Sequence, residues 1–331
     1  MYDPFAGRGT TSIEAGLLNR NIISNDINPL SQILTKPRLE IPILEEILNR
    51  LKKIQIDDTN RAEIDLSMFY HKKTESEIIS LKNYLYSKKK ENSEDFIDRW
   101  IRMVATSRLT GHSASFFSVY TLPPNQAVTP ENQIKINQKR KQIPPYRDVK
   151  KIILAKSKSL LMDVTDKIRK NLFEISKKAI MLTKDARDTH EIPKESIKLT
   201  VTSPPFLNIV QYSKDNWLRC WFNSIDVEEV SKNITMSKTI NKWVDVMNDV
   251  FKELYRITQK DGWVAFEVGE VNKGKYQLED YVIPLGTNNG FDCFGVIINL
   301  QEFTKTSNIW GVNNNMSGTN TNRIVVFRKN D

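Results

Sequence analysis

Apolar side chains recur at strand and helix spacing at the beginning of the chain. Residues 2–5 are extended and lead into a glycine turn, and residues 12–18 then carry apolar side chains at helical spacing. Residues 21–26 form a second short strand pattern that ends in an acid, and the Asn-Pro pair that follows predicts a further turn. The first forty residues therefore predict a strand, a glycine turn, a helix and a second strand.

Stretches with helical periodicity follow this start. Residues 40–86, 96–109 and 150–178 are predicted to be mainly helical. Residues 88–93 are predicted to form an exposed, charged loop, and residues 111–124 an irregular segment with aromatic side chains. The middle of the chain thus predicts a helical region between two regions that contain strands.

Strand patterns return near residue 180 and continue towards the end of the chain. The predicted strands span residues 179–182, 199–202, 262–268, 293–300 and 323–328. Because short buried strands alternate with helical segments, we predict an α/β fold with a Rossmann-like sheet. We assign residues 1–39 and 179–331 to the domain that contains this sheet, and residues 40–178 to a large, mainly helical insertion.

The composition limits the class of protein. With 331 residues, of which 39% are hydrophobic and 27% charged, the chain is long enough to bury a sizeable core. No apolar run approaches the roughly 18 to 20 residues of a membrane-spanning helix, and the first residues lack a secretory signal pattern. We therefore expect a cytoplasmic protein with no membrane partner. Cys220 and Cys293 lack the paired spacing of a zinc site, and the three histidines are scattered, so we expect no metal.

The chain carries a formal net charge of +9, and one stretch accounts for this excess. Between Lys135 and Lys178, fourteen lysines and arginines stand against four acids. Such a run is either the solvated face of a helix or a surface that meets a polyanion. Charge alone does not decide between these two interpretations.

The glycine turn Asp3-Pro-Phe-Ala-Gly-Arg-Gly-Thr-Thr11 permits three interpretations. A phosphate loop needs a lysine after its last glycine, but Thr10 follows Gly9. A dinucleotide fingerprint needs a third glycine or alanine where Ser12 stands. In an S-adenosyl-L-methionine site, the glycines let the backbone approach the methionine part of the cofactor, and Asp26, at the end of the next strand, is placed to bind the ribose hydroxyls.

A second motif, Thr202-Ser-Pro-Pro-Phe206, follows directly on a predicted strand. Two successive prolines fix the backbone and remove amide donors, so neighbouring carbonyl groups can face a ligand as acceptors. Ligands of a parallel sheet bind at the carboxyl ends of its strands. The alternative interpretation is a rigid turn that only ends the strand.

Together, the two motifs resemble those of the amino-methyltransferases of DNA. The first motif of that family reads Asp-Pro-Phe-x-Gly-x-Gly-Thr-Thr, and its catalytic motif reads Ser/Asn/Asp-Pro-Pro-Tyr/Phe; both stand here nearly intact. The resemblance covers about residues 2–38 and 180–330. It implies a methyltransferase sheet, S-adenosyl-L-methionine as cofactor and double-stranded DNA as partner.

The resemblance also implies roles for individual residues. Asp26 would hold the ribose, Asp185 would meet the adenine amino group of the cofactor, and Phe5 would line the cofactor pocket. The implied cofactor-binding residues are Asp3, Phe5, Gly7, Gly9, Thr10, Asp26 and Asp185, and the implied catalytic residues are Ser203, Pro204, Pro205 and Phe206. Serine at the first catalytic position usually accompanies methylation at N4 of cytosine in this family, whereas aspartate or asparagine accompanies N6 of adenine.

The predicted function is therefore methyl transfer to N4 of cytosine at a specific DNA sequence, within a restriction-modification system. The base must leave the duplex, Phe206 offers an aromatic face for it, and the basic insertion supplies phosphate contacts and sequence choice. Only Met1 and Tyr2 precede Asp3, whereas related enzymes carry a segment before the glycine motif, so we expect either a truncated chain or a partner polypeptide that supplies this segment. The alternatives are a DNA-binding remnant or subunit with weak catalysis, and a methyltransferase acting on N6 of adenine or on RNA.

Overall fold

The computed structural model describes residues 1–121, 128–205, 212–233, 239–271, 276–300 and 321–330. The chain divides into two compact units. The first, here the sheet unit, comprises Met1–Gln32, Lys178–Val210 and Asn233–Asp331. The second, here the helical unit, comprises Ile33–Lys177 and Gln211–Lys232.

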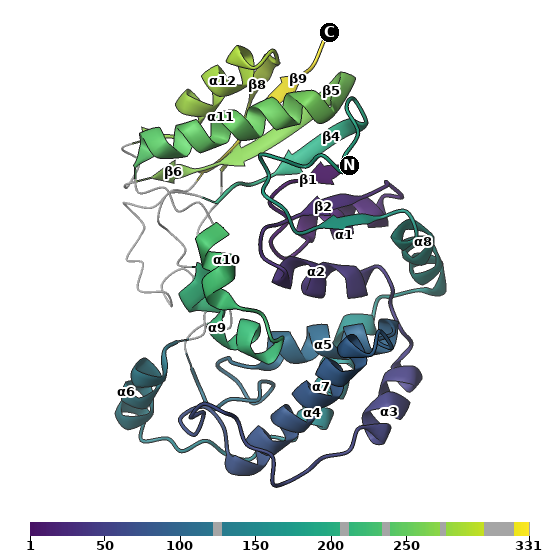
Figure 1. Ribbon diagram of the computed structural model, residues 1–331, viewed down its shortest axis with the longest axis vertical. Helices are drawn as coiled ribbons and strands as arrows, with labels where there is room; N and C mark the ends of the chain where they lie inside the picture. Colours follow the sequence, from purple (N-terminus) through teal and green to yellow (C-terminus); the bar gives the residue numbers. More distant parts are fainter. Residues whose placement is uncertain (122–127, 206–211, 234–238, 272–275, 301–320, 331) are drawn as a thin grey trace. The chain divides into compact units, whose positions relative to one another are not determined.

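The sheet unit is built on a seven-stranded sheet within the described residues (Figure 1). Its strands are β1 (Tyr2–Asp3), β2 (Ile23–Asn25), β3 (Ile180–Leu182), β4 (Ile197–Thr202), β5 (Thr258–Val268), β8 (Asp292–Leu300) and β9 (Thr321–Arg328). The helices of this unit are α1 (Thr10–Leu17), α11 (Ile240–Ile257) and α12 (Glu279–Asn288), with α2 (Leu30–Thr35) at the boundary between the units. A separate short pair is formed by β6 (Glu270–Val271) and β7 (Tyr276–Gln277).

The strand order is β3-β2-β1-β4-β5-β9-β8, and it changes direction between β1 and β4. The strands from β3 to β5 pair in parallel, whereas β9 is antiparallel to both β5 and β8. In open α/β sheets of this kind, ligands bind beyond the carboxyl ends of the strands at such a switch point. The predicted α/β fold with a Rossmann-like sheet is confirmed. A ligand-binding site is expected at the junction of β1 and β4.

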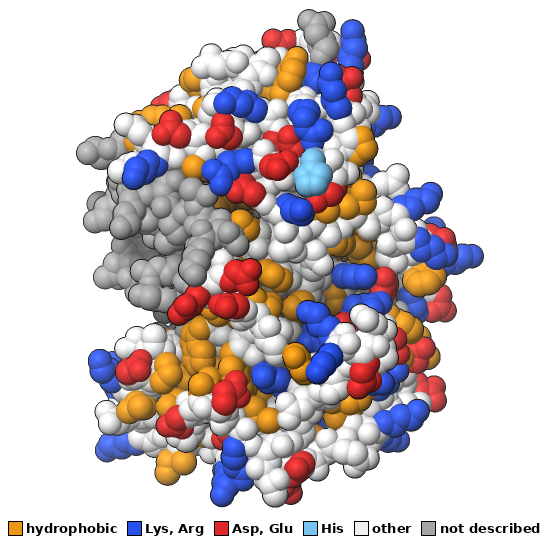
Figure 2. Space-filling model, in the orientation of Figure 1, with side chains coloured by type: hydrophobic (Ala, Val, Ile, Leu, Met, Phe, Trp, Pro, Cys, Tyr) orange, Lys and Arg blue, Asp and Glu red, His pale blue; other side chains and the backbone are white. Residues whose placement is uncertain are grey.

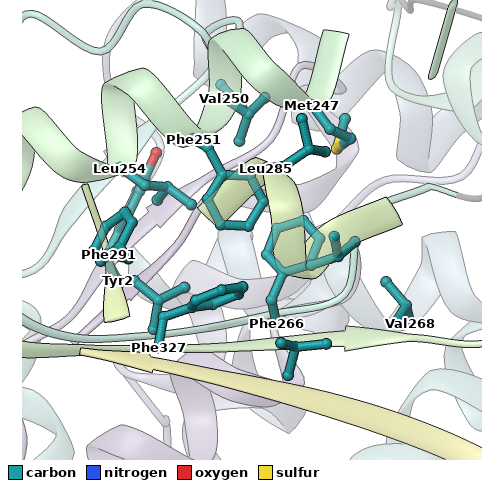
Figure 3. Packing of buried hydrophobic residues seen from close by; sticks show 14 of the residues in the cluster. Tyr2, Met247, Val250, Phe251, Leu254, Phe266, Val268, Leu285, Phe291 and Phe327 are labelled. Atoms are coloured by element: carbon teal, nitrogen blue, oxygen red, sulfur yellow. The ribbon is translucent and has the colours of Figure 1, made fainter. Parts of the chain in front are cut away.

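Helix α11 covers the sheet with one apolar stripe. Its buried apolar side chains recur every three or four residues, at Trp243, Met247, Val250, Phe251, Leu254 and Ile257. Phe251 packs against Phe266 of β5 and Phe327 of β9, with ring centroids 5.0 and 5.4 Å apart (Figure 3). Burying one such aromatic side chain contributes roughly 1.5–3 kcal/mol, so the stripe holds α11 firmly on the strands.

The helical unit has a core of its own. Its elements are η1 (Lys36–Arg38), α3 (Leu44–Lys53), α4 (Lys72–Lys90), α5 (Phe96–Arg108), α6 (Pro130–Arg140), α7 (Val149–Leu161), α8 (Asp166–Ser176), α9 (Tyr212–Phe222) and α10 (Val227–Asn233). Trp100 of α5 donates from its indole nitrogen to the Ser157 hydroxyl of α7 at 3.0 Å. Arg50 of α3 binds Asp95 and Asp98, which form the capping box at the start of α5. These buried and partly buried polar contacts fix the helices relative to one another.

Residues 211–232 belong to the helical unit, whereas the sequence pattern placed them in the domain of the sheet, residues 179–331. Two side chains explain the difference. The Trp217 indole donates to the Val128 carbonyl at 3.3 Å, and the Asn223 amide donates to the Thr106 hydroxyl at 2.9 Å. The helical unit thus consists of two separate segments of the chain rather than one insertion.

The loop predicted at residues 88–93 begins later than expected. Helix α4 continues through Lys88 and Lys89 and ends at Lys90, with Glu91 as its C-cap. A run of lysines in the last turn of a helix is favourable because the carboxyl end of the helix dipole attracts cations. The charge run was therefore a signal for a helix end and not for a loop.

Candidate functional site

The glycine turn connects the end of β1 to α1 at the switch point. Gly7 and Gly9 both have backbone φ angles in the left-handed region, at 53° and 75°, where a side chain would be strained. The Gly9 N–H group donates to the Ala6 carbonyl at 2.7 Å and closes the turn. Gly9 is also the residue that precedes α1, and it provides no side-chain cap for the first amide groups of that helix. A ligand can therefore approach this part of the backbone closely.

Asp26 follows β2 and faces the glycine turn. One of its carboxylate oxygens accepts the Gly7 N–H group and the other accepts the Asn28 N–H group, both at 2.8 Å. Burial raises the pKa of the Asp26 carboxyl, although these two hydrogen bonds oppose the increase. A carboxylate can accept about four hydrogen bonds, so each oxygen keeps an acceptor position for a hydroxyl donor.

Asp3 joins the glycine turn to the end of β4. Its side chain is buried, and one carboxylate oxygen accepts the Thr202 hydroxyl at 2.6 Å and the Phe5 N–H group at 3.1 Å. Burial raises the pKa of Asp3 to about 6 against the effect of these hydrogen bonds. Because Thr202 is the last residue of β4, the bond brings the glycine turn and the proline turn to the same edge of the sheet.

The proline turn begins directly after Thr202. Ser203 and Pro205 are exposed and Pro204 is buried. Among the described residues, none forms a hydrogen bond with the Ser203 hydroxyl. The carbonyl oxygen of Pro205 accepts a hydrogen bond of 3.0 Å from the indole of Trp243. Phe206, the last residue of the predicted catalytic motif, lies outside the described residues.

Asn25 connects the glycine turn to the loop that follows β3. Its side-chain amide donates to the carbonyl groups of Pro4 and Lys184, at 3.3 and 3.0 Å, and its oxygen accepts the Lys184 N–H group at 3.0 Å. Asn25 itself is buried, and its bond to the Pro4 carbonyl is shielded from water. The residues after Pro4 and Lys184 are Phe5 and Asp185, and Asn25 therefore fixes two predicted cofactor-binding residues at once.

Asp185 is held by Arg187 within its own loop. The Arg187 guanidinium donates to both carboxylate oxygens, at 2.9 and 2.6 Å, and the Arg187 N–H group adds a third bond at 2.9 Å. Burial works against ionisation of Asp185, but the bonds from Arg187 outweigh it and lower the pKa of the carboxyl. One acceptor position remains on the oxygen that receives a single bond.

The same loop is anchored further along by a partly buried ion pair. Thr189 donates from its N–H group and its hydroxyl to Glu253 of α11, at 2.9 and 2.6 Å. Arg256 binds both oxygens of Glu253 and also the Thr189 and Ile192 carbonyls. Burial opposes ionisation of Glu253, but the bonds from Arg256 and Thr189 lower its pKa overall.

The remaining predicted residues lie around this edge of the sheet. Phe5 is half-buried and packs against the core, and Thr10 is the exposed first residue of α1. The structure thus gathers the described members of both predicted motifs at the carboxyl ends of β1, β2 and β4. Sequence reasoning missed Asn25 and Trp243 as parts of this edge, because an asparagine or a tryptophan at these positions has no distinctive spacing.

The basic stretch of the sequence lies on α6, α7 and α8 and the segments that join them. Ten of its fourteen lysines and arginines are exposed. Three of its four acids pair with cations on the same helix or beside it: Asp148 with Lys151, Asp166 with Arg169, and Glu174 with Lys177. On the face drawn in Figure 2, lysine and arginine side chains lie beside acidic ones.

In the part of the chain that the structure describes, no helix has both the length and the apolar character needed to cross a membrane. Within the same residues, no three histidine, cysteine, aspartate or glutamate side chains are grouped so that they could hold a metal ion.

Comparisons with known proteins give a distant likeness in fold. No family model matches the sequence, and no curated protein matches it either. A solved structure from Thermus thermophilus, described as a DNA modification methylase, is 21% identical over 44% of this chain and 50% of its own, with a TM-score of 0.29. The same protein complexed with S-adenosyl-L-methionine is 19% identical over 44% of this chain and 54% of its own, with a TM-score of 0.28.

A structure of an S-adenosylmethionine-dependent methyltransferase from Methanosarcina mazei is 10% identical over 51% of this chain and 80% of its own, with a TM-score of 0.26. This chain spans about half the length of the Thermus structures that it matches. At these identities and TM-scores the likenesses do not indicate the function of this chain. Its fold is assigned from the strand order alone.

Proposed function

We propose that this chain is an S-adenosyl-L-methionine-dependent methyltransferase that modifies N4 of cytosine in a specific sequence of double-stranded DNA, as part of a restriction-modification system. The observation that supports the proposal is the hydrogen bond of 2.6 Å between Thr202 and Asp3. It joins the two turns that carry the motifs at the switch point of the sheet, where α/β folds bind their ligands.

The residues beside the glycine turn fit the proposed cofactor. Gly7 and Gly9 leave backbone without Cβ atoms next to the position proposed for the methionine part. Each oxygen of Asp26 keeps one acceptor position, which matches the two hydroxyl donors of a ribose. Asp185 keeps one acceptor position for the adenine amino group. When bound, S-adenosyl-L-methionine supplies an electrophilic methyl group on a sulfonium.

The proline turn provides acceptors for the target amino group. The lone pair of an exocyclic amine is delocalised into the ring, which makes the amine a weak nucleophile. Hydrogen bonds from its two N–H groups to the Ser203 hydroxyl and the Pro204 carbonyl would localise that pair on nitrogen. The prolines contribute by holding these two acceptors on a rigid backbone with no competing amide donor.

The helical unit is proposed to bind the duplex and to choose the sequence. The base has to leave the stack before Ser203 can reach it, and unstacking costs a few kcal/mol. The exposed lysines and arginines of α6, α7 and α8 can offset this cost through contacts with phosphates. Phe206 is proposed to stack on the extruded base.

Methyl transfer by the purified chain tests the proposal. The chain is incubated with S-adenosyl-L-methionine and duplex DNA of mixed sequence, the DNA is digested to nucleosides, and the methylated bases are identified by mass spectrometry. We expect N4-methylcytosine. N6-methyladenine would overturn the choice of base, and methylation of RNA but not of DNA would overturn the choice of nucleic acid. No transfer to any of them, with DNA binding retained, would reduce the chain to a DNA-binding protein.

The two ends of β4 offer a matched pair of variants. Ser203→Ala removes the proposed acceptor, and we expect it to lower the single-turnover rate about a hundredfold. Ser196→Ala removes an exposed hydroxyl just before the same strand, where it donates to the Pro193 carbonyl, and we expect it to leave the rate unchanged. Equal rates for the two variants would remove Ser203 from the mechanism.

A further inference from the structure

Trp243 forms the one described hydrogen bond between helix α11 and the proline turn. The indole nitrogen donates to the carbonyl oxygen of Pro205 at 3.0 Å, and the side chain is only 3% exposed. Trp243 lies in the first turn of α11, which begins after the Thr239 cap. The bond therefore reaches from a regular helix to an irregular turn.

The proline turn has few groups that can stabilise it by hydrogen bonds within the turn. Pro204 and Pro205 have no N–H groups, so neither can donate a hydrogen bond within the turn. The position of the indole, by contrast, is set by the apolar stripe of α11, which packs Met247 and Phe251 against the sheet beside it. The indole N–H group of Trp243, which is held on a rigid helix, thus fixes the Pro205 carbonyl at the end of the described turn.

We propose that Trp243 is a positioning residue for methyl transfer. By holding the Pro205 carbonyl, it fixes the rotation of the proline turn about the end of β4, and with it the two acceptors at Ser203 and Pro204. This inference rests on the proposed function, because the acceptors matter only if an amino group meets them. If its role were purely structural, Trp243 would only stabilise the fold by packing, as the other buried aromatic side chains of the core do.

The variant Trp243→Phe removes the donor and keeps an aromatic ring in the core. Trp100→Phe is its matched control, since Trp100 is also 3% exposed and also donates one hydrogen bond of 3.0 Å, but within the helical unit. Three quantities are measured for each variant and for the wild type: the thermal midpoint, the dissociation constant for S-adenosyl-L-methionine, and the single-turnover rate with saturating DNA.

We expect both variants to lower the thermal midpoint by similar amounts and to leave the dissociation constant within about twofold. Trp243→Phe alone should lower the single-turnover rate, by between about ten- and a hundredfold, because a small displacement of catalytic groups has an effect of that size. A rate for Trp243→Phe equal to that of Trp100→Phe would overturn the inference and leave the proposed function intact.

A second measurement does not depend on activity. Hydrogen exchange of the peptide segment around residues 200–205 should be faster in Trp243→Phe than in Trp100→Phe. If the wild type transfers no methyl group, the proposed function fails, and this measurement still decides whether Trp243 holds the turn. Unchanged exchange in Trp243→Phe would overturn the inference in either case.

Discussion

The burial of the Asp3 carboxyl predicts how the free energy of unfolding depends on pH. Asp3 is 3% exposed, and burial raises its pKa to about 6 from the ordinary value of 3.8. A raised pKa means that the folded protein prefers the protonated acid. The resulting stabilisation is fully present below pH 3.8 and is lost as the pH rises through about 6. A shift of roughly two pKa units corresponds to about 3 kcal/mol.

The variant Asp3→Asn removes this dependence with little change in shape. Both the Thr202 hydroxyl and the Phe5 N–H group donate to the same oxygen of Asp3, and the amide oxygen of asparagine can accept both. The new NH₂ group then needs an acceptor, and the hydroxyl of Thr11, which lies beside Asp3, can rotate to provide it. The variant should therefore resemble the protonated wild type at every pH.

Urea unfolding of both proteins between about pH 4 and pH 7 measures the effect. The free energy of unfolding of Asp3→Asn minus that of the wild type should rise by up to about 3 kcal/mol over this range. Asp280→Asn, which removes one negative charge from an exposed position, corrects for the change in net charge. A difference that stays flat, or that falls as the pH rises, would refute the argument from burial.

Three further predictions concern other parts of the molecule. Asp26→Ala should weaken binding of S-adenosyl-L-methionine at least about tenfold in calorimetry. A tenfold loss corresponds to about 1.4 kcal/mol, which is a modest cost for the loss of both acceptors of the ribose hydroxyls. An unchanged affinity would contradict the assignment of Asp26 to the ribose. Lys329→Met should lower the free energy of unfolding in urea by roughly 2–4 kcal/mol, because the buried ammonium donates to the Tyr255 and Thr258 carbonyls, whereas exposed Lys260→Met should have little effect. Replacing exposed Lys167 and Lys170 of α8 by glutamine should reduce the salt slope of DNA binding by about two in fluorescence anisotropy, and an unchanged slope would exclude this helix from the interface.

The parts of the site that lie in consecutive residues could be predicted from the sequence. Gly7 and Gly9 marked the turn because glycine alone adopts left-handed backbone angles without strain, and the structure has both in that region. The junction of the two motifs also followed from a general property of α/β sheets, since parallel strands end at the same edge. The sequence therefore predicts that the two turns lie close together, but it does not predict the hydrogen bond from Thr202 to Asp3 that joins them.

The residues that hold the site together could not be predicted, because their contacts are distant in the sequence. Asn25 binds Lys184 across 159 positions, and Trp243 binds Pro205 across 38. Residues of these types occur throughout the chain, and only the folded geometry selects the ones that matter. The place of residues 211–232 in the helical unit could not be predicted for the same reason, since it depends on contacts such as that between Asn223 and Thr106.

The interleaving of the two units along the chain has a consequence for the order of folding. Asp3 and Thr202 are 199 positions apart, yet β1 and β4 are neighbours at the centre of the sheet. If residues 33–177 fold first, the loop that must close between these strands shortens to about 50 flexible residues, and two halvings of loop length lower the entropic cost by about 1 kcal/mol. We therefore expect pulse-labelled amides of α5 to be protected before those of β4 during refolding, so that the edge of the sheet with the two motifs is completed last.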